Sequence, residues 1–182
     1  MPETATPPDD LRYPVGRHEP VGEVTAADRA RWIGEVAALP AGFRAAVAGL
    51  DAAQLETPYR PGGWTVRQLV HHLADSHLNA YTRCKLALTE AEPTIKPYDE
   101  ARWAELPDVA AVDPAVSLAL LDALHLRWAA LLERLTPDHW ARTLRHPERP
   151  RPMRLDDVLA LYAWHGRHHT AHVTRLRERM GW

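Results

Sequence analysis

Apolar residues recur at steps of three or four along four stretches of this chain, which is the spacing of an amphipathic helix. In the first stretch, about residues 25–50, they are Trp32, Val36, Leu39, Phe43, Val47 and Leu50. Thr25 and Asp28 have the spacing of a capping pair at its start. Pro40 falls inside the stretch, and because proline removes a backbone donor we expect a kink or a break there. The pattern predicts a long helix over residues 25–50.

Cap signals place the starts of the next two long helices. Thr65 and Gln68 form a second capping pair after a loop rich in proline and glycine, which predicts a helix over residues 66–90. Asp113 followed by Pro114 is the favoured order of a cap residue and a first helical residue. We therefore expect a third helix to begin there.

The third helix is expected to run to about residue 135, preceded by a short helical piece at 98–106. Its predicted apolar stripe is Val116, Leu120, Leu124, Trp128, Leu131, Leu132 and Leu135. After a loop with three prolines, the fourth helix is predicted from Leu155 to Met180, with Gly181 as its terminator.

These elements define the expected fold class. No stretch alternates with the period of two that is typical of strands, so we predict an all-α protein without a sheet. Four long helices joined by long connections indicate a four-helix bundle, in which crossovers can replace simple up-and-down neighbours. Residues 1–12 are polar, acidic and proline-bearing and are predicted to be disordered, which leaves residues 13–182 as a single domain.

Composition and charge limit the kinds of protein and of partner that fit this chain. A chain of 182 residues with 46% hydrophobic content can bury a core without disulfides, and the lone Cys84 has no internal partner. The formal charge of −2 comes from interspersed acids and arginines, so nucleic acid is not an expected partner. No leader pattern and no uninterrupted apolar run of membrane-spanning length is evident, so we expect a soluble cytoplasmic protein.

The histidines are clustered in the sequence, and this clustering is the strongest indication of the chemistry of the protein. The chain has eleven, and four of them fall within the segment WHGRHHTAH near the C-terminus: His165, His168, His169 and His172. Positions four apart share one face of a helix, so imidazoles spaced this way can converge on one metal ion. Two such pairs exist, His165 with His169 and His168 with His172.

Position around the fourth helix separates the two pairs. Its core face is marked by Leu155, Val158, Leu159, Tyr162, Val173, Leu176 and Met180. Relative to the centre of that face, His169 lies at about 20°, His165 at about 60°, His172 at about 80° and His168 at about 120°. We therefore expect the first pair to face the core, His168 to face solvent, and His172 to contact the ligands or the substrate from the boundary. Gly166 weakens the helix locally but allows close approach by another helix or by substrate.

A third ligand is expected from the second helix, which carries His71, His72 and His77. The same geometry places His77 near the middle of the apolar face and His72 about 110° from it, so geometry alone favours His77 mildly. A single histidine on an apolar face is more often a hydrogen-bonded core residue, and the alternative for the whole cluster is a partly solvated, pH-sensitive face.

Three segments of the chain resemble one protein family. They are TPYRPGGWTVRQLVHHLADSH, PYDEARWAEL and LYAWHGRHHTAHVTRLRERMGW. They resemble the YfiT-type proteins of the DinB/YfiT superfamily, which are regarded as metal-dependent hydrolases, over nearly the whole chain from Tyr13 to Trp182. The resemblance implies a four-helix bundle, a cytoplasmic homodimer, and one divalent ion per subunit, zinc or nickel, on three histidines.

The family pattern also implies the ligand set. Its first ligand follows the tryptophan before the second helix by eight positions and precedes a leucine, which matches Trp64, His72 and Leu73. Its other two ligands form an H-x-x-x-H pair in the last helix, which matches His165 and His169. The resemblance thus implies His72, His165 and His169, with His77 as the alternative to His72.

Three protein ligands leave a coordination position open, as in catalytic metal sites. The first hypothesis is hydrolysis of a small-molecule substrate by activated water, with Asp75 and His172 as candidates for proton transfer. The second, suggested by related superfamily members, is transfer of a low-molecular-weight thiol such as bacillithiol to an electrophile, as in a bacillithiol S-transferase. The third is a metal-binding module without turnover. The chain lacks HExxH, GxSxG and a phosphate-binding glycine loop, which disfavours zincin, serine-hydrolase and nucleotide chemistry.

Overall fold

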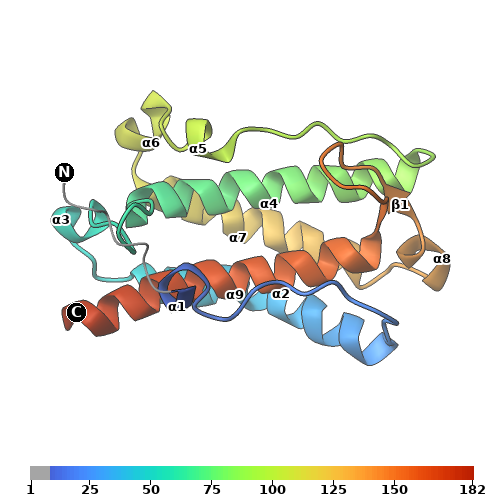
Figure 1. Cartoon of the computed structure of the whole chain (residues 1–182), viewed down its shortest axis with the longest axis horizontal. Helices are drawn as coiled ribbons and strands as arrows, with labels where there is room; N and C mark the ends of the chain where they lie inside the picture. The colour runs from blue at the N-terminus through green and yellow to red at the C-terminus, as the bar shows by residue number, and fades with distance from the viewer. Residues whose placement is uncertain (1–8) are drawn as a thin grey trace.

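The computed structural model describes residues 9–182, and within them four long helices form a bundle (Figure 1). They are α2 (Ala26–Val47), α4 (Val66–Thr89), α7 (Pro114–Leu132) and α9 (Leu155–Met180). The predicted four-helix bundle is confirmed, and the four predicted ranges agree with these helices to within three residues at each end.

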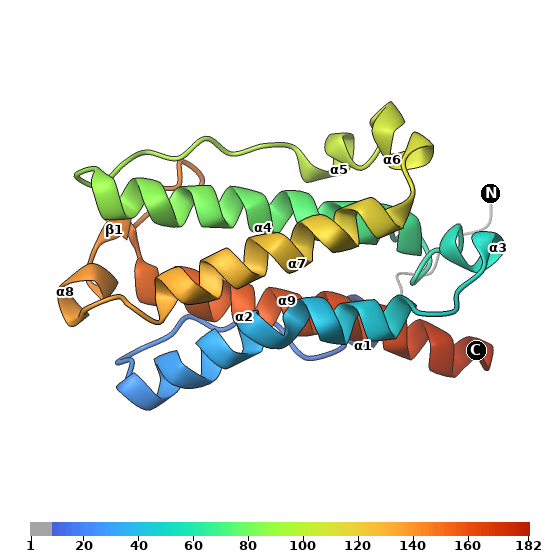
Figure 2. The same ribbon diagram turned by 180° about the vertical axis from the view of Figure 1, so that it is seen from behind.

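The order of the helices around the bundle differs from their order in the chain. Helix α9 packs against α2 and α4, and α7 packs against the same two helices. The first long helix, α2, therefore lies diagonally across the core from the second, α4, and the third, α7, lies diagonally from the fourth, α9. In Figure 1, α4 and α7 both run from left to right while α2 and α9 run from right to left; Figure 2 shows the same arrangement from behind. The long connection between α4 and α7 returns along the outside of α4, and such a crossover is what the long predicted connections allow.

The helix ends follow from the residues that cap them. Thr25 Oγ1 accepts from the Asp28 amide at 3.1 Å, and Thr65 Oγ1 accepts from the Gln68 amide at 3.1 Å, so both predicted capping boxes form. At the other end of the chain, Gly181 adopts a left-handed φ of 71°, the conformation in which glycine ends a helix.

Pro40 does not break α2, which continues from Ala26 to Val47. Proline lacks the N–H that would donate to the carbonyl four residues earlier, which leaves the Val36 oxygen without its helical partner. That oxygen lies 2.6 Å from Nδ1 of His125 on α7 instead. A side chain from a neighbouring helix thus takes the place of the missing donor.

Several short elements accompany the four long helices, and most of them were not predicted. The helical ones are α1 (Asp9–Arg12), α3 (Ala52–Leu55), α5 (Glu100–Trp103), α6 (Pro107–Ala111) and α8 (Pro137–Trp140). Of these only α5 falls within the short helical piece predicted at 98–106. A two-residue antiparallel pair, β1 (Thr143–Leu144) with β2 (Met153–Arg154), corrects the prediction that no strand forms. Two residues are too few to establish an alternating pattern in sequence.

The segment expected to be disordered, residues 1–12, falls mostly outside the described residues, which begin at residue 9. Its last four residues form α1, and the carbonyl of Arg12 lies 3.3 Å from Nε2 of His172. From there the chain runs along α9 towards α2 (Figure 1). Trp164 donates its Nε1–H to the Gly16 carbonyl at 3.0 Å, which ties this N-terminal segment to α9.

The buried face of α7 differs from the predicted stripe. Val116 is 58% exposed and Leu120 42% exposed, and the buried residues of α7 are Pro114, Leu118, Leu121, Leu124, His125, Trp128, Ala129 and Leu132. Most positions of α7 are apolar on every side of the helix, so periodicity could not identify the face that packs. Among the described residues α7 is also the helix that is long and apolar enough, by length and composition only, to cross a membrane. In the bundle it packs between α2 and α4.

Candidate metal centre

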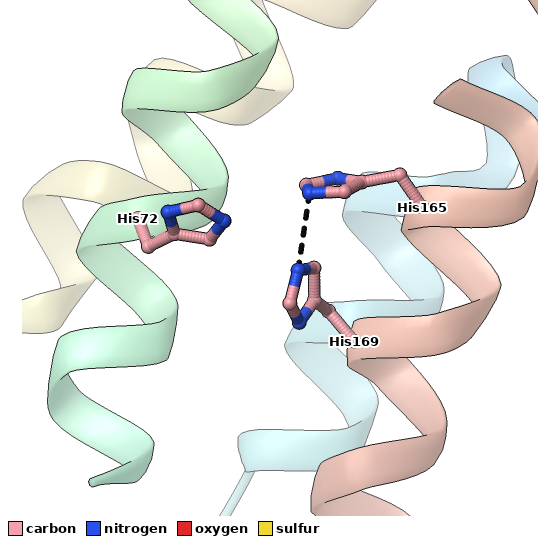
Figure 3. A group of neighbouring side chains, drawn as sticks. All are labelled: His72, His165 and His169. Atoms are coloured by element: carbon pink, nitrogen blue, oxygen red, sulfur yellow. Dashed lines mark hydrogen bonds between the residues drawn. The ribbon is translucent and has the colours of Figure 1, made fainter. Parts of the chain in front are cut away.

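Three histidines from two helices meet at the middle of the bundle (Figure 3). His72 projects from α4, and His165 and His169 project from successive turns of α9. The Nε2 atoms of His165 and His169 are 3.0 Å apart, and the ring of His72 lies 5.5 Å and 5.1 Å from their rings. One nitrogen of each ring lies within 4.8 Å of the other two, which makes the three a group that could hold a metal ion.

The protonation state of the three rings suits a metal. Burial lowers the pKa of His72 to about 4. Burial, and next the neighbouring histidines, lower the pKa of His165 and of His169 well below the ordinary value. All three imidazoles are therefore neutral at pH 7, with a lone pair available for coordination. A set of three imidazoles is a donor set that zinc, nickel and related divalent ions accept.

His77 lies beside this group without being part of it. It is fully buried at the centre of the apolar face of α4, as helical geometry predicts. Its Nε2 lies 3.1 Å from Nδ1 of His165, on the opposite side of that ring from the Nε2 that faces His169. The structure thus brings His72, the residue that the resemblance implied, to the other two histidines, and it places His77 behind one of them.

The group opens onto a cavity of 590 Å³, a size suited to a small molecule. His72, His165, His169 and His172 line it, together with residues from the N-terminal segment, the loop before α4 and the long connection after α4. Tyr98 and Arg60 are examples from the two loops. Loops that lie far apart in sequence therefore decide the shape of the cavity.

Comparison with known proteins identifies the family. Residues 35–173 match the DinB superfamily. The chain belongs to the DinB superfamily. A protein from Bacillus mycoides named "Putative metal-dependent hydrolase BcerKBAB4_2443" is 54% identical over 173 residues, which cover 95% of this chain and 99% of that protein.

The DinB fold is also seen in a solved relative. YfiT from Bacillus subtilis is 49% identical over 173 residues, covering 95% of this chain and 97% of that protein. Its solved structure has a TM-score of 0.92 to this one and covers 95% of this chain and 99% of the solved chain. It is described as "a probable metal-dependent hydrolase with an unusual four-helix bundle topology". The resemblance inferred from sequence is confirmed at the level of family and fold.

In this DinB protein, His168 is placed differently from its predicted position. His172, predicted at the boundary in contact with ligands or substrate, lines the cavity with the candidate ligands. His168 is 7% exposed, not facing solvent, and His172 is 3% exposed. The ring of His168 stacks on Trp164 at 4.5 Å, and the ring of His172 stacks on Tyr59 at 4.0 Å. A helical wheel shows only which side faces the other helices, whereas here the loops also cover the flank of α9.

The two candidates for proton transfer are also separated by the fold. His172 lines the cavity, but Asp75 is not among its lining residues. Burial, and then the nearby carboxylate of Asp108, raise the pKa of Asp75. Asp108 belongs to α6, so the Asp75 carboxylate lies on the side of α4 that faces α6.

Gly166 allows another helix to approach, which is one of the two roles predicted for it. A Cβ at this position would lie 2.9 Å from both Cδ atoms of Leu39 on α2. Gly166 directly follows His165, so the absence of a side chain lets α2 pack closely against the part of α9 that carries the candidate ligands.

Sequence reasoning missed His125, which is 1% exposed on α7. Its Nε2 lies 3.0 Å from Nδ1 of His77, and its Nδ1 faces the Val36 carbonyl. The signal was present, since Pro40 frees a buried carbonyl and His125 lies three residues before the predicted core residue Trp128. The wrong choice of the α7 face concealed it.

Proposed function

We propose that this DinB protein is a metal-dependent hydrolase that holds one divalent ion, zinc or nickel, on His72, His165 and His169. The observation that carries the proposal is the convergence of three neutral imidazoles from two helices at the wall of a 590 Å³ cavity. The names of the relatives, which describe them as metal-dependent hydrolases, support the same conclusion.

His72, His165 and His169 would hold the ion at the wall of the cavity, which all three line. A divalent ion held by three imidazoles supplies Lewis-acid activation of a water molecule at neutral pH. His165 and His169 belong to one helix, α9, and the ring of Trp64 lies 4.4 Å from that of His72. This packing keeps the ligand rings in place before an ion arrives.

His172 lines the cavity and is the candidate for proton transfer that this proposal retains. Its Nε2 lies 3.3 Å from the Arg12 carbonyl oxygen, which can only accept, so Nε2 carries the proton. The lone pair of the neutral ring is then on Nδ1, a buried atom that has no hydrogen-bond partner among the described residues. The other sequence candidate, Asp75, lies outside the cavity lining and is not assigned a role.

We propose that the substrate carries an acidic group, because three arginines line the cavity against two carboxylates, Glu100 and Glu148. Arg12, Arg60 and Arg83 line it, and within the described part of the chain none of them is ion-paired to a carboxylate. The Nε of Arg60 is buried and lacks a hydrogen-bond partner there. A carboxylate or phosphate on the substrate would supply a hydrogen-bond acceptor for the guanidinium, and charge-assisted hydrogen bonds of this kind are strong.

The metal site is tested by metal content. Purified wild-type protein is expected to hold one divalent ion per chain by mass spectrometric elemental analysis, and His165→Ala and His72→Gln are expected to lose it. His71→Gln is the matched control, because His71 is adjacent on α4 but its Nδ1 contacts Ser117 at 2.8 Å. A full metal complement in His165→Ala would refute the site.

Hydrolysis is tested with paired esters and amides that differ only by a carboxylate remote from the scissile bond. We expect metal-dependent turnover, with the acidic member of a pair preferred about tenfold or more. Arg60→Ala should remove much of that preference and Arg60→Lys less. Equal rates for the two members would leave the hydrolase in place and reject the acidic substrate.

Thiol transfer is the second candidate, because an open position on three imidazoles also accepts a thiolate. The chain's own thiol is not the nucleophile, since burial raises the pKa of Cys84 to about 12 and it does not line the cavity. Incubation with a low-molecular-weight thiol and monochlorobimane would give a conjugate if transfer is the activity. No conjugate alongside ester turnover would favour hydrolysis, and tight metal binding with neither activity would indicate a binding module.

We further propose that the protein is a cytoplasmic homodimer, as the family resemblance implies. Three large apolar side chains are exposed on the outer side of α7: Val116 at 58%, Leu120 at 42% and Leu126 at 76%. Exposed apolar groups gathered on one helix are typical of an interaction surface. A second copy of the chain is the occupant that we propose for it.

A further inference from the structure

A row of buried polar groups leads from the backbone of α2 to the candidate ligand His165. Nδ1 of His125 is 2.6 Å from the Val36 oxygen, and Nε2 of His125 is 3.0 Å from Nδ1 of His77. Nε2 of His77 is in turn 3.1 Å from Nδ1 of His165. The residues come from three other elements, α2, α7 and α4, and end at α9.

The first group in the row can only accept. A carbonyl oxygen has no proton, so the Nδ1 of His125 that faces Val36 must carry one. The oxygen is available because Pro40, four residues later in α2, has no N–H to donate to it. The proline in the helix therefore determines which nitrogen of His125 is protonated.

Each later ring follows from the one before it. His125 and His77 are 1% and 0% exposed, and their ring nitrogens contact a carbonyl oxygen and other imidazoles, not a carboxylate. A charge buried without a counter-ion is costly, so each ring is neutral and has one N–H. His125 therefore accepts at Nε2, from the Nδ1–H of His77. His77 then accepts at its own Nε2, from the Nδ1–H of His165. The remaining nitrogen of His165, Nε2, has the lone pair.

We propose that His125 and His77 are positioning residues that hold His165 in the tautomer required of a metal ligand. The row sets both the orientation of the His165 ring and the direction of its lone pair, towards His169 and His72. Metal-binding histidines commonly donate their second N–H to a carbonyl or carboxylate. Here two buried imidazoles connect that N–H to a carbonyl on another helix. The inference rests on the proposed metal site, but the tautomer exists without a metal.

The tautomer is therefore tested in the metal-free full-length protein. Long-range proton–nitrogen correlation spectra of protein labelled with ¹⁵N in histidine distinguish Nδ1–H from Nε2–H rings. In the wild type we expect Nδ1–H for His125, His77 and His165. Protonation of His165 at Nε2 would overturn the proposal whether or not the protein binds a metal or hydrolyses anything.

Substitution at the far end of the row separates positioning from simple contact. His125 does not touch a candidate ligand, yet His125→Leu should convert His165 into a mixture of tautomers and weaken zinc binding about 10-fold to 100-fold, as measured by chelator competition. His125→Gln, whose amide both donates and accepts, should retain more of the affinity. An unchanged His165 tautomer in folded His125→Leu would overturn the proposal.

Two further variants complete the design. His77→Phe fills the same space without a donor or acceptor, and it should alter the His165 tautomer at least as much as His125→Leu. His71→Phe is the matched control on α4, because His71 contacts Ser117 on α7 and takes no part in the row. It should leave both the tautomer and the zinc affinity unchanged. Equal losses of zinc affinity in His71→Phe and His77→Phe would show a general effect of repacking α4 and would reject the positioning role of His77.

Discussion

Burial lowers the pKa of several histidines of this protein. Burial lowers the pKa of His72 to about 4, of His168 to about 4 and of His172 to about 3. In the unfolded chain each would titrate near the ordinary value of about 6.5. Between these values the unfolded chain binds protons that the folded protein does not, so acid favours unfolding.

A stability profile follows from that difference. The contribution of these histidines to the free energy of unfolding of the metal-free protein should be complete above pH 6.5 and decline as the pH falls towards 4, by about 3 kcal/mol for a deeply buried histidine such as His72, whose pKa is lowered to about 4. Urea unfolding at pH 7.5, 6 and 4.5 would measure this. His168→Phe keeps an aromatic ring against Trp164 but cannot titrate, so its profile should be less steep; an identical profile would contradict the assignment.

Ligand choice at the residue scale required both pattern and position. The spacing of His165 and His169 predicted that they would share a face, because a helix repeats every 3.6 residues. Helical geometry alone could not decide between His72 and His77, which lie five residues apart on α4. Both point inwards from α4, and only the position of α9 brings His72 to the open side of His165 and His77 to its back.

At the scale of elements, the contact between α2 and α9 depends on Gly166. A side chain there would lie 2.9 Å from both Cδ atoms of Leu39, which is 7% exposed, so the Leu39 side chain would have to shift. Gly34 on α2 is the matched control, since a Cβ there has nothing within 4 Å.

The same substitution should therefore have opposite effects at the two glycines. Gly34→Ala should raise the free energy of unfolding by about 1 kcal/mol through helix propensity. Gly166→Ala should lower it, because overpacking a tight contact costs about 1–3 kcal/mol. Chemical denaturation of the two variants is the measurement, and equal stabilisation by both would show that α2 and α9 are not in close contact.

Helix ends were predictable because their causes are local. The hydroxyls of Thr25 and Thr65 cap residues three positions away, and Gly181 ends α9 by its own backbone conformation. The buried face of α7 was not predictable, since a helix that is apolar on all sides has no pattern to follow. The continuity of α2 at Pro40 depends on a donor from α7, which no local rule contains.

At the scale of the whole molecule, the exposed side of α7 predicts self-association. Leu126 is 76% exposed, so Leu126→Glu should leave the fold intact while placing a charge on the proposed dimer surface. Light scattering after size-exclusion chromatography should show a dimer for the wild type and a monomer for the variant. Leu106→Glu, at a 49% exposed position before α6, is the control and should remain dimeric. A wild-type monomer at micromolar concentration would refute the homodimer.

The sequence by itself determined the four long helices, their caps, the bundle class, and the pairing of His165 with His169, because each depends on residues within a few positions of one another. The tertiary structure decided the diagonal order of the helices, the burial of His168 and His172 under loops, and the connection from Pro40 through His125 and His77 to His165. These features join atoms from segments that can be more than a hundred residues apart. Local periodicity cannot predict which distant segment will lie beside a given face of a helix.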